Sequence, residues 1–460
     1  MPQQIANNEE ISREQGDVNL SQQRLDYQET HLDDKSRELV AQDKQLFLHQ
    51  SLSTPVLHAL SHSEGAYIYD FSGKRYLDCH GNGVHAAGFN NDHVIESMIK
   101  ALKDKNTFTS RRYTNTNIVA LAQKLIDITP DGLDRVSFCP GGSEAIELAV
   151  SIAKSYTNKW KTISFWDSYH GNGFQSASLG GERLFKKRLG PMVPGALHVD
   201  FPNYQNNPWG FDTQHQVDDE IIRQMRTLFE KEGDIACVVG EPISATPVMP
   251  SQDFWHRVKA LCEEFGALLI FDEIIEGFGR TGKMFACEHY VTPDVLVLGK
   301  SLGGGLVPFA GVVVSEKYNV LETQSVGHYT HEKNGLCGAA GLAMIESLQE
   351  QNLVENSMRL GEYLKGRFLE MQDQYAIVGA VDGIGLHIGI EILDKANQEK
   401  DSRGLKEAET IMYHCFENGL AFKLIESSII TLRPSLVITE QDAKFIADTI
   451  EKAIQSVLSK

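Results

Sequence analysis

From about His93 onward, short apolar segments alternate with stretches of helical periodicity along this chain of 460 residues. The apolar segments expected to be strands are residues 136–138, 162–165, 237–239, 268–271 and 295–298. Helical stretches such as 253–265 lie between them. Alternation of this kind favours a mainly parallel sheet that is covered on both faces by helices. The pattern therefore predicts an α/β fold that binds ligands beyond the carboxyl ends of its strands.

The two ends of the chain differ from this central part. Residues 1–40 are rich in Gln, Asn, Glu and Asp and poor in apolar residues, so they are expected to form either a mobile tail or a peripheral helical arm. Residues 1–65 are assigned to this tail and arm. We expect a large ligand-binding domain over 66–335 and a smaller α+β C-terminal domain over 336–460, because a chain this long suits more than one lobe.

Composition excludes several classes of function. The net charge of −19 argues against nucleic acid as a partner, because phosphate backbones attract basic surfaces. It does not argue against a small anionic substrate, which responds to the local field. No apolar run is long enough to cross a bilayer and no signal pattern is present, so a cytoplasmic protein without a membrane partner is expected. The seven scattered cysteines are expected to be reduced core thiols, with no zinc site or other metal site.

Two of the expected strands are followed by residues of opposite charge. Lys300 follows residues 295–298 and precedes a run of three glycines, and Asp272 follows residues 268–271. A lysine amine can form a Schiff base with an aldehyde, and a carboxylate can keep a pyridine nitrogen protonated. Taken singly, such a lysine is usually a solvated loop charge and such an aspartate a helix N-cap. Together they predict a pyridoxal phosphate site.

Three further segments carry groups that such a cofactor needs. In CPGGSEAIELAV, Gly142 and Ser143 form a turn into a helix, which presents backbone N–H groups to a phosphate. In DSYHG, Tyr169 can stack on a flat ring beside His170, and in HYTHEKNG, Thr330 can donate to a phosphate. Each segment also has an ordinary interpretation: a plain strand-to-helix turn, a core tyrosine and a polar loop.

In this order the segments resemble the class III aminotransferase family of pyridoxal phosphate enzymes (fold type I). The resemblance runs from YIYDFSGKRYLDCHGNGVHAAGF at 67–89 to TLRPSLVIT at 431–439. It implies that Lys300 carries the cofactor and that Asp272 pairs with the ring nitrogen. It also implies an active homodimer or a dimer of dimers.

The same resemblance assigns the remaining cofactor contacts. Gly142 and Ser143 match the phosphate-binding turn, and Tyr169 matches the stacking aromatic residue that is followed by His170. Thr330 matches a threonine that reaches the phosphate of the neighbouring subunit.

The chain departs from the family pattern at two positions, which bears on the type of reaction. The family segment Asp-Glu-Val-Gln is replaced here, so that Ile275 stands where a glutamine contacts the cofactor. Thr431 stands where many transaminases have an arginine for the substrate carboxylate, although Arg433 lies two residues along, on the same face of a strand. Glu241 matches the usual partner of that arginine. A glutamate-linked transaminase is therefore weakened as an interpretation but stays open.

The segment FTSRRYTN is unlike that of typical transaminases. Arg111 and Arg112 beside a tyrosine can clamp a phosphonate or phosphate with their guanidinium groups, or they can be ordinary surface or salt-bridge residues. With the segments DCHGNGVHAAG, CPGGSEAIE and TISFWDSYHG, it is most similar to a subgroup of the family that acts as (R)-1-hydroxy-2-aminoethylphosphonate ammonia-lyase. We therefore predict a lyase whose small anionic amine substrate is held by Arg111, Arg112 or Arg433.

Two alternatives remain beside the lyase. One is an aminotransferase that moves an amino group from an ω-amine to a keto acid. The other is a non-catalytic member of the fold, which the presence of both Lys300 and Asp272 disfavours.

Overall fold

The structure is a computed structural model that describes residues 21–50, 56–107, 112–397 and 402–459. The chain divides into two compact units. The large unit is Asn82–Met358, and the small unit combines the described residues of Met1–Gly81 with those of Arg359–Lys460. The N-terminal segment thus belongs to the same unit as the C-terminal part. The division into three domains at 65/66 and 335/336 stays a prediction.

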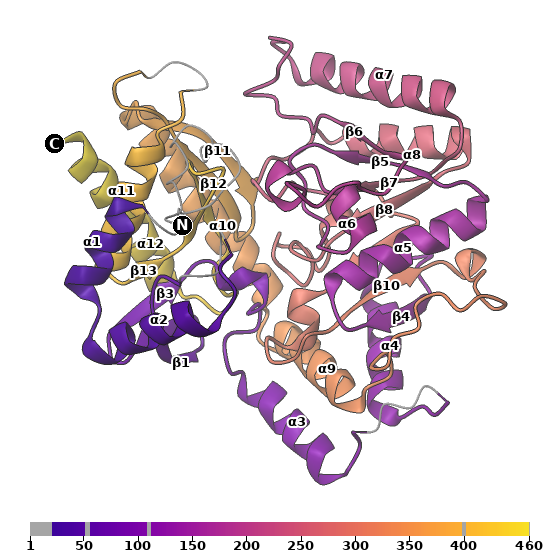
Figure 1. The fold of residues 1–460 in the computed structure, drawn as a ribbon, viewed down its shortest axis with the longest axis horizontal. Coiled ribbons are helices and arrows are strands. Elements are labelled where there is room, and N and C mark those ends of the chain that lie inside the picture. Colours follow the sequence, from indigo (N-terminus) through magenta and orange to yellow (C-terminus); the bar gives the residue numbers. More distant parts are fainter. Residues whose placement is uncertain (1–20, 51–55, 108–111, 398–401, 460) are drawn as a thin grey trace. The chain divides into compact units, whose positions relative to one another are not determined.

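The large unit is built around a seven-stranded sheet with the order β4-β10-β9-β8-β7-β5-β6 (Figure 1). Its strands are β4 (Arg135–Cys139), β5 (Lys161–Phe165), β6 (Ala196–Val199), β7 (Ile235–Gly240), β8 (Leu268–Asp272), β9 (Val295–Leu298) and β10 (Ala310–Val314). The neighbours β9, β8, β7, β5 and β6 are parallel, whereas β10 is antiparallel to both β9 and β4. Because only β10 is reversed, the other six strands all end at one edge. The expected mainly parallel sheet is confirmed.

All five strands expected from the sequence are present as β4, β5, β7, β8 and β9, while β6 and β10 were not predicted. The helices of the large unit are α3 (Asp92–Lys103), α4 (Thr116–Ile128), α5 (Gly142–Thr157), α6 (Phe174–Leu179), α7 (Gln214–Glu232), α8 (Phe254–Phe265) and α9 (Gly335–Glu350). Helix α8 is the one expected over 253–265, and Asp253 is its N-cap residue. Helix α10 (Leu353–Gln374) begins in the large unit and continues in the small one.

Alternate residues of the central strands bury the two faces of the sheet against different helices. Cys237, Val239 and Ile270 pack with α5 in one hydrophobic core. Phe271 points to the opposite face, where its ring lies 4.8 Å from that of Trp255 in α8. Because side chains alternate along a strand, strands that are apolar at every position require this cover on both sides.

The small unit contains two four-stranded sheets, with the orders β1-β2-β3-β13 and β11-β12-β15-β14. Their strands are β1 (Leu60–Glu64), β2 (Tyr67–Asp70), β3 (Arg75–Asp78), β11 (Val378–Ile384), β12 (His387–Ile392), β13 (Leu420–Ala421), β14 (Lys423–Ile425) and β15 (Ile429–Leu432). Its helices are α1 (Gln22–His31), α2 (Asp34–Leu46), α11 (Leu405–Glu417) and α12 (Glu440–Leu458).

Contacts between distant parts of the chain explain why the N-terminal segment joins the small unit. Strand β13 pairs in parallel with β3. The buried Tyr27 of α1 places its ring 5.5 Å from that of Tyr413 and 5.4 Å from that of Phe416, both in α11. Of the two interpretations of the N-terminal segment, the helical arm therefore describes residues 22–46, whereas residues 1–20 lie outside the described part.

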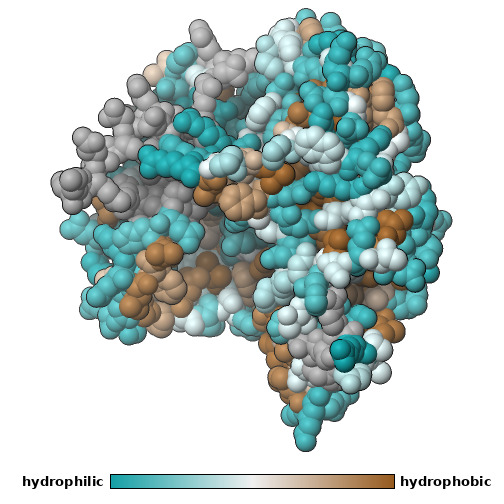
Figure 2. Space-filling view, turned by 45° about the vertical axis from the view of Figure 1, so that its right-hand side comes forward, coloured by the Kyte–Doolittle hydropathy of each residue, from teal (hydrophilic) through white to brown (hydrophobic). Residues whose placement is uncertain are grey.

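The surface drawn in Figure 2 is mostly hydrophilic, with apolar residues emerging in separate patches. Exposed apolar side chains such as Ile99 and Leu102 in α3 are of this kind. All seven cysteines are buried and none forms a disulfide with another described residue, as expected for core thiols. In the described part of the chain, no helix is long and apolar enough to cross a membrane.

Candidate active site

The predicted cofactor residues of the large unit follow strands that end at the same edge of the seven-stranded sheet. Lys300 follows β9, Asp272 ends β8, and Glu241 follows β7. Tyr169 and His170 follow β5, and the glycine turn follows β4. Residues that are far apart in the sequence are brought together here because parallel strands present their carboxyl ends side by side.

Lys300 has an unusual backbone conformation. It begins the short 3-10 helix η4 (Lys300–Gly303) with a φ of 43°, in the left-handed region that residues with a side chain rarely adopt. Holding a residue there costs about 1–3 kcal/mol, and such strain is concentrated at functional sites. The side chain is half-buried, and a Cβ atom on Gly83 would lie 3.4 Å from its Cδ.

Asp272 is buried and is held by two donors. His170 Nδ1 lies 2.8 Å from Asp272 Oδ2, and the Ile274 N–H donates to Oδ1 at 3.1 Å. Burial alone lowers the pKa of His170, but its hydrogen bond with Asp272 and the charges of Asp272 and Glu241 outweigh burial, so the pKa is raised. The buried carboxylate of Asp272 thus has two hydrogen-bond partners in an apolar setting. Nε2 of the same ring is buried and has no hydrogen-bond partner among the described residues.

Glu241 lies near this pair but is held separately. It is buried, its Oε2 accepts the Ala245 N–H at 2.9 Å, and its charge contributes to the raised pKa of His170. The structure thus brings Glu241, His170 and Asp272 together, and the prediction that Glu241 contacts the cofactor stays a prediction.

The turn between β4 and α5 has the features of an anion-binding turn. Gly141 precedes α5 in an extended conformation, and no side chain caps the helix, so its first N–H groups are not satisfied by a capping side chain. Ser143 Oγ accepts the Asn172 N–H at 3.1 Å, which leaves the hydroxyl hydrogen to be donated elsewhere. The backbone of Gly171, at a φ of 124°, approaches so closely that a Cβ there would lie 2.4 Å from Ser143 Oγ.

Ile274 closes this turn on its other side. A Cβ on Gly142 would lie 2.8 Å from Ile274 Cδ1, and a Cβ on Gly299 would lie 3.3 Å from its Cγ1. The Ile274 side chain therefore lies between the phosphate turn and the residue before Lys300. Sequence analysis gave Ile274 no role, although its position two residues after Asp272 was a usable signal.

A cavity of about 340 Å³ joins the lysine to the turn. Its lining includes Lys300, Gly141, Gly142, Val84 and Phe309. A cavity of this size lies within the range that small ligands and cofactors occupy in proteins, about 300–1,000 Å³.

Tyr169 is supported from outside by a residue that sequence analysis missed. Its ring lies 4.5 Å from that of Phe185, at an angle of 55°. Burial is the main cause of a raised pKa for the Tyr169 hydroxyl, with the charge of Glu182 next. Nothing in the sequence around Phe185 pointed to this contact.

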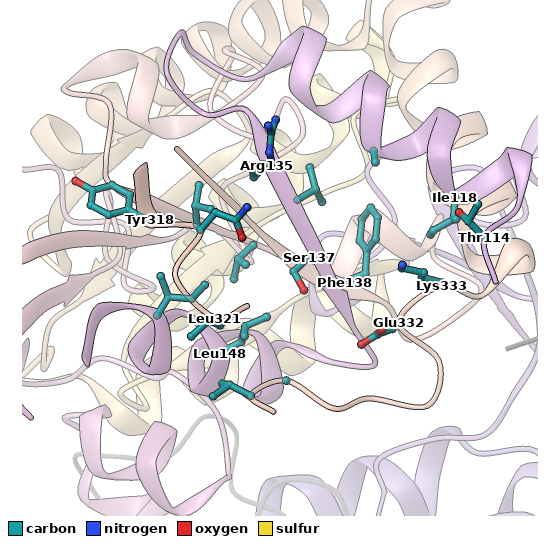
Figure 3. Close-up of a pocket in the computed structure, with 18 of the residues that line it drawn as sticks. Thr114, Ile118, Arg135, Ser137, Phe138, Leu148, Tyr318, Leu321, Glu332 and Lys333 are labelled. Atoms are coloured by element: carbon teal, nitrogen blue, oxygen red, sulfur yellow. The ribbon is translucent and has the colours of Figure 1, made fainter. Parts of the chain in front are cut away.

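Thr330 lies on an exposed loop of the large unit. The neighbouring Tyr329 hydroxyl donates to the Glu144 carbonyl oxygen at 3.1 Å, which ties this loop to the first turn of α5. The loop also borders a second cavity of about 480 Å³, which is lined by residues of α4, β4 and α5 as well as by Glu332 and Lys333 (Figure 3). Exposure of Thr330 agrees with a contact to a neighbouring subunit but does not test it.

The three predicted substrate arginines are not assembled by one unit. Arg111 lies outside the described residues, and Arg112 is exposed in a turn before α4. Arg433 is buried in the small unit, where its backbone N–H donates to the Cys79 carbonyl oxygen at 2.6 Å. Their roles toward a substrate stay predictions.

The comparison with known proteins agrees with this geometry. The family model of class III aminotransferases matches residues 49–454. The chain belongs to the class III aminotransferase family. It is 35% identical to the (R)-1-hydroxy-2-aminoethylphosphonate ammonia-lyase of Vibrio splendidus strain 12B01, over 97% of this chain and 95% of that protein.

The chain is also similar to two proteins that are named as aminotransferases or transaminases. It is 33% identical to the acetylornithine aminotransferase of Archaeoglobus fulgidus, over 87% of this chain and 94% of that protein. The crystal structure of a transaminase from a marine Virgibacillus superposes with a TM-score of 0.83 at 29% identity, over 92% of this chain and 99% of that one. The family and the fold type I architecture predicted from the sequence are thereby confirmed.

Pyridoxal phosphate is the cofactor of this family, and the residues at the strand ends fit it. Lys300 has the amine that its aldehyde would need, and the buried carboxylate of Asp272 would be the partner for its ring nitrogen; both roles stay predictions. The turn at Gly142 and Ser143 leaves no room for a Cβ at Gly142 and offers N–H and hydroxyl donors for a phosphate.

Proposed function

We propose that this protein is an ammonia-lyase that converts (R)-1-hydroxy-2-aminoethylphosphonate to phosphonoacetaldehyde and ammonia. The observation that carries the proposal is the 35% identity over 97% of the chain to the ammonia-lyase of Vibrio splendidus. The match extends over nearly the whole of both proteins, so it spans the segments that carry the predicted site residues.

The residues of the site are suited to this reaction. Pyridoxal phosphate, when bound, supplies an aldehyde that takes up the substrate amine and a ring that accepts electrons. The amine of Lys300 then removes a proton from the carbon that bears the nitrogen. Asp272, hydrogen-bonded to His170, would stabilise a positive charge at the ring nitrogen. The site is therefore built to stabilise negative charge on that carbon.

The substrate itself supplies the leaving group. Its hydroxyl lies on the carbon next to the deprotonated one and departs as water after gaining a proton. A proton shift from nitrogen to the carbon beside phosphorus turns the resulting enamine into an imine. Addition of water to its carbon–nitrogen double bond gives phosphonoacetaldehyde and ammonia, so that atoms balance without a second substrate. No keto acid is required.

The departures from the transaminase pattern support this proposal. A lyase has no need for the α-carboxylate of a keto acid, and Thr431 stands where many transaminases have an arginine for it. A phosphonate still needs a cationic partner, and Arg433, Arg112 and Arg111 are the candidates.

An aminotransferase that moves an amino group from a primary amine to a keto acid is the second candidate function. It is favoured by Glu241, which matches the partner of the transaminase arginine, and by the likeness to the Virgibacillus transaminase. The two functions differ in whether they need an amino-group acceptor.

Ammonia release without a keto acid distinguishes them. The purified protein loaded with pyridoxal phosphate is incubated with the hydroxylated aminophosphonate alone, and ammonia and aldehyde are measured. We expect equal amounts of both. Turnover only after addition of pyruvate or 2-oxoglutarate, with a new amino acid formed, would replace the lyase by the aminotransferase.

We also propose that the active form is a homodimer or a dimer of dimers. The exposed position of Thr330 supports this, since its loop is fixed to α5 while the threonine itself remains open to a second chain. Sedimentation of the protein at assay concentration measures the assembly. A fully active monomer would contradict the proposal.

A further inference from the structure

A short basic segment lies against the candidate cofactor site and has no assigned role. In GERLFKKRLG, Arg183, Lys186, Lys187 and Arg188 fall within six consecutive residues, in a chain of net charge −19. Cations concentrated in this way in an acidic chain produce a local positive field, which is where a small anion is attracted.

The segment is fixed to the turn that carries Tyr169. The Gly181 N–H donates to the Ser168 carbonyl oxygen at 2.8 Å. A Cβ on Gly181 would lie 2.3 Å from the Asp167 nitrogen, so the two backbone stretches are in direct contact. Phe185 then places its ring 4.5 Å from that of Tyr169. Through Phe185, the basic segment therefore packs against a ring that is predicted to stack on the cofactor.

The backbone of the segment is ordered by its own turns. The Lys187 N–H donates to the Arg183 carbonyl oxygen at 2.9 Å, and the Leu189 N–H donates to the Lys186 carbonyl oxygen at 3.1 Å. The charged groups are therefore presented from a defined framework.

One of the four cations already has a partner. Lys186 Nζ lies 5.4 Å from the centre of the Trp166 ring. Lys186 is therefore not one of the available charges.

The other three cations are available to a ligand. Arg183, Lys187 and Arg188 are exposed, and none of them forms an ion pair with another residue that the structure describes.

We propose that Arg183, Lys187 and Arg188 form a cationic patch that attracts the anionic group of the substrate and selects amines that carry a phosphonate or phosphate. The proposal rests on the proposed function in that it names the substrate class of the same site. It differs from the predicted arginine clamp because these residues act through their electrostatic field and are not required for the chemical step.

The test removes the three charges while keeping an unbranched polar side chain at each position. The variant combines Arg183→Gln, Lys187→Gln and Arg188→Gln, since glutamine is uncharged. Arg188 has a φ of 67°, so its replacement should be an unbranched residue as well. A matched control combines Lys103→Gln, Lys231→Gln and Lys452→Gln, three exposed lysines outside this segment. Both triple variants change the net charge by the same amount.

Binding is measured on the pyridoxal phosphate form through the change in visible absorption, with 2-aminoethylphosphonate and with the uncharged analogue ethanolamine. Calorimetric titration with methylphosphonate, which has no amine, gives a second measure of anion binding. We expect the dissociation constants of both phosphonates to rise about five- to tenfold at low salt in the segment variant. The constant for ethanolamine should stay unchanged, and added salt should reduce the difference between variant and wild type.

Three results would overturn the proposal: equal weakening of ethanolamine, equal weakening in the control variant, or unchanged phosphonate binding in the segment variant. Thermal denaturation of each variant checks that the fold is retained. Since these titrations do not require ammonia release, a failure of the lyase assay with selective phosphonate binding would reject the proposed reaction and leave the patch standing. Ammonia release without selective phosphonate binding would reject only the patch.

Discussion

Asp272 in the large unit and Asp78 in the small unit are both buried aspartates at the end of a strand, yet their surroundings differ. Asp272 is paired with an imidazole, whose Nδ1 lies 2.8 Å away. The Asp78 carboxylate accepts the His80 N–H at 2.9 Å, and burial raises the pKa of Asp78 to about 6. The comparison teaches that burial favours the protonated form of a strand-end carboxylate such as Asp78, whereas the Asp272 carboxylate is buried against an imidazole that can share its proton.

The largest effect is expected at Lys300, which lies at the same edge of the sheet as Asp272. Lys300→Ala should lower turnover by about a thousandfold or more, because both the covalent link to the cofactor and the base are lost. Turnover and visible absorption measure this, and reduction with borohydride followed by peptide mapping should locate the cofactor on Lys300. A modified peptide that contains another lysine would disprove the assignment.

Replacing the two aspartates tests the comparison directly. Asp272→Asn should retain bound cofactor but lower kcat about a hundredfold, since the charge opposite the ring nitrogen is removed. Asp78→Asn, the matched change in the small unit, should leave kcat within a few-fold of wild type. An equal loss of activity in Asp272→Asn and Asp78→Asn would contradict the difference drawn between the two aspartates.

A smaller effect is expected from the buried arginine of the small unit. Arg433→Gln should raise KM for aminophosphonates about ten- to a hundredfold with less change in kcat, if its guanidinium binds the far anionic group of the substrate. Ethanolamine serves as the control substrate. An unchanged KM for both amines would remove Arg433 from the substrate site and leave the anion to the arginines and lysines of the large unit.

The smallest effect concerns stability. The folded state raises the pKa of Asp78 from 3.8 to about 6, so the folded protein binds this proton more tightly than the unfolded chain. Stability is therefore lost as the pH rises from about 4 to 6, by about 1–3 kcal/mol. Urea unfolding of the apoprotein across this range should show that Asp78→Asn reduces the loss. The same slope in wild type and variant would show that other groups cause it.

Much of the large unit could be predicted from the sequence because its signals are local. The apolar runs that became β7, β8 and β9 are buried at every position, and a run of this kind has few alternatives to a central strand. Strands β6 and β10 were not predicted. Ala196–Val199 is short and only partly buried, so its pattern is weak.

The sequence by itself determined which residues are the candidates for the chemistry: a lysine after β9, an aspartate at the end of β8 and a glycine turn before α5. Only the tertiary structure decided how they are used. It paired His170 with Asp272, placed Ile274 against Gly142, and set Phe185 against Tyr169. These contacts join positions that no local pattern links, because strand order and chain packing, which depend on the whole sequence, bring them together.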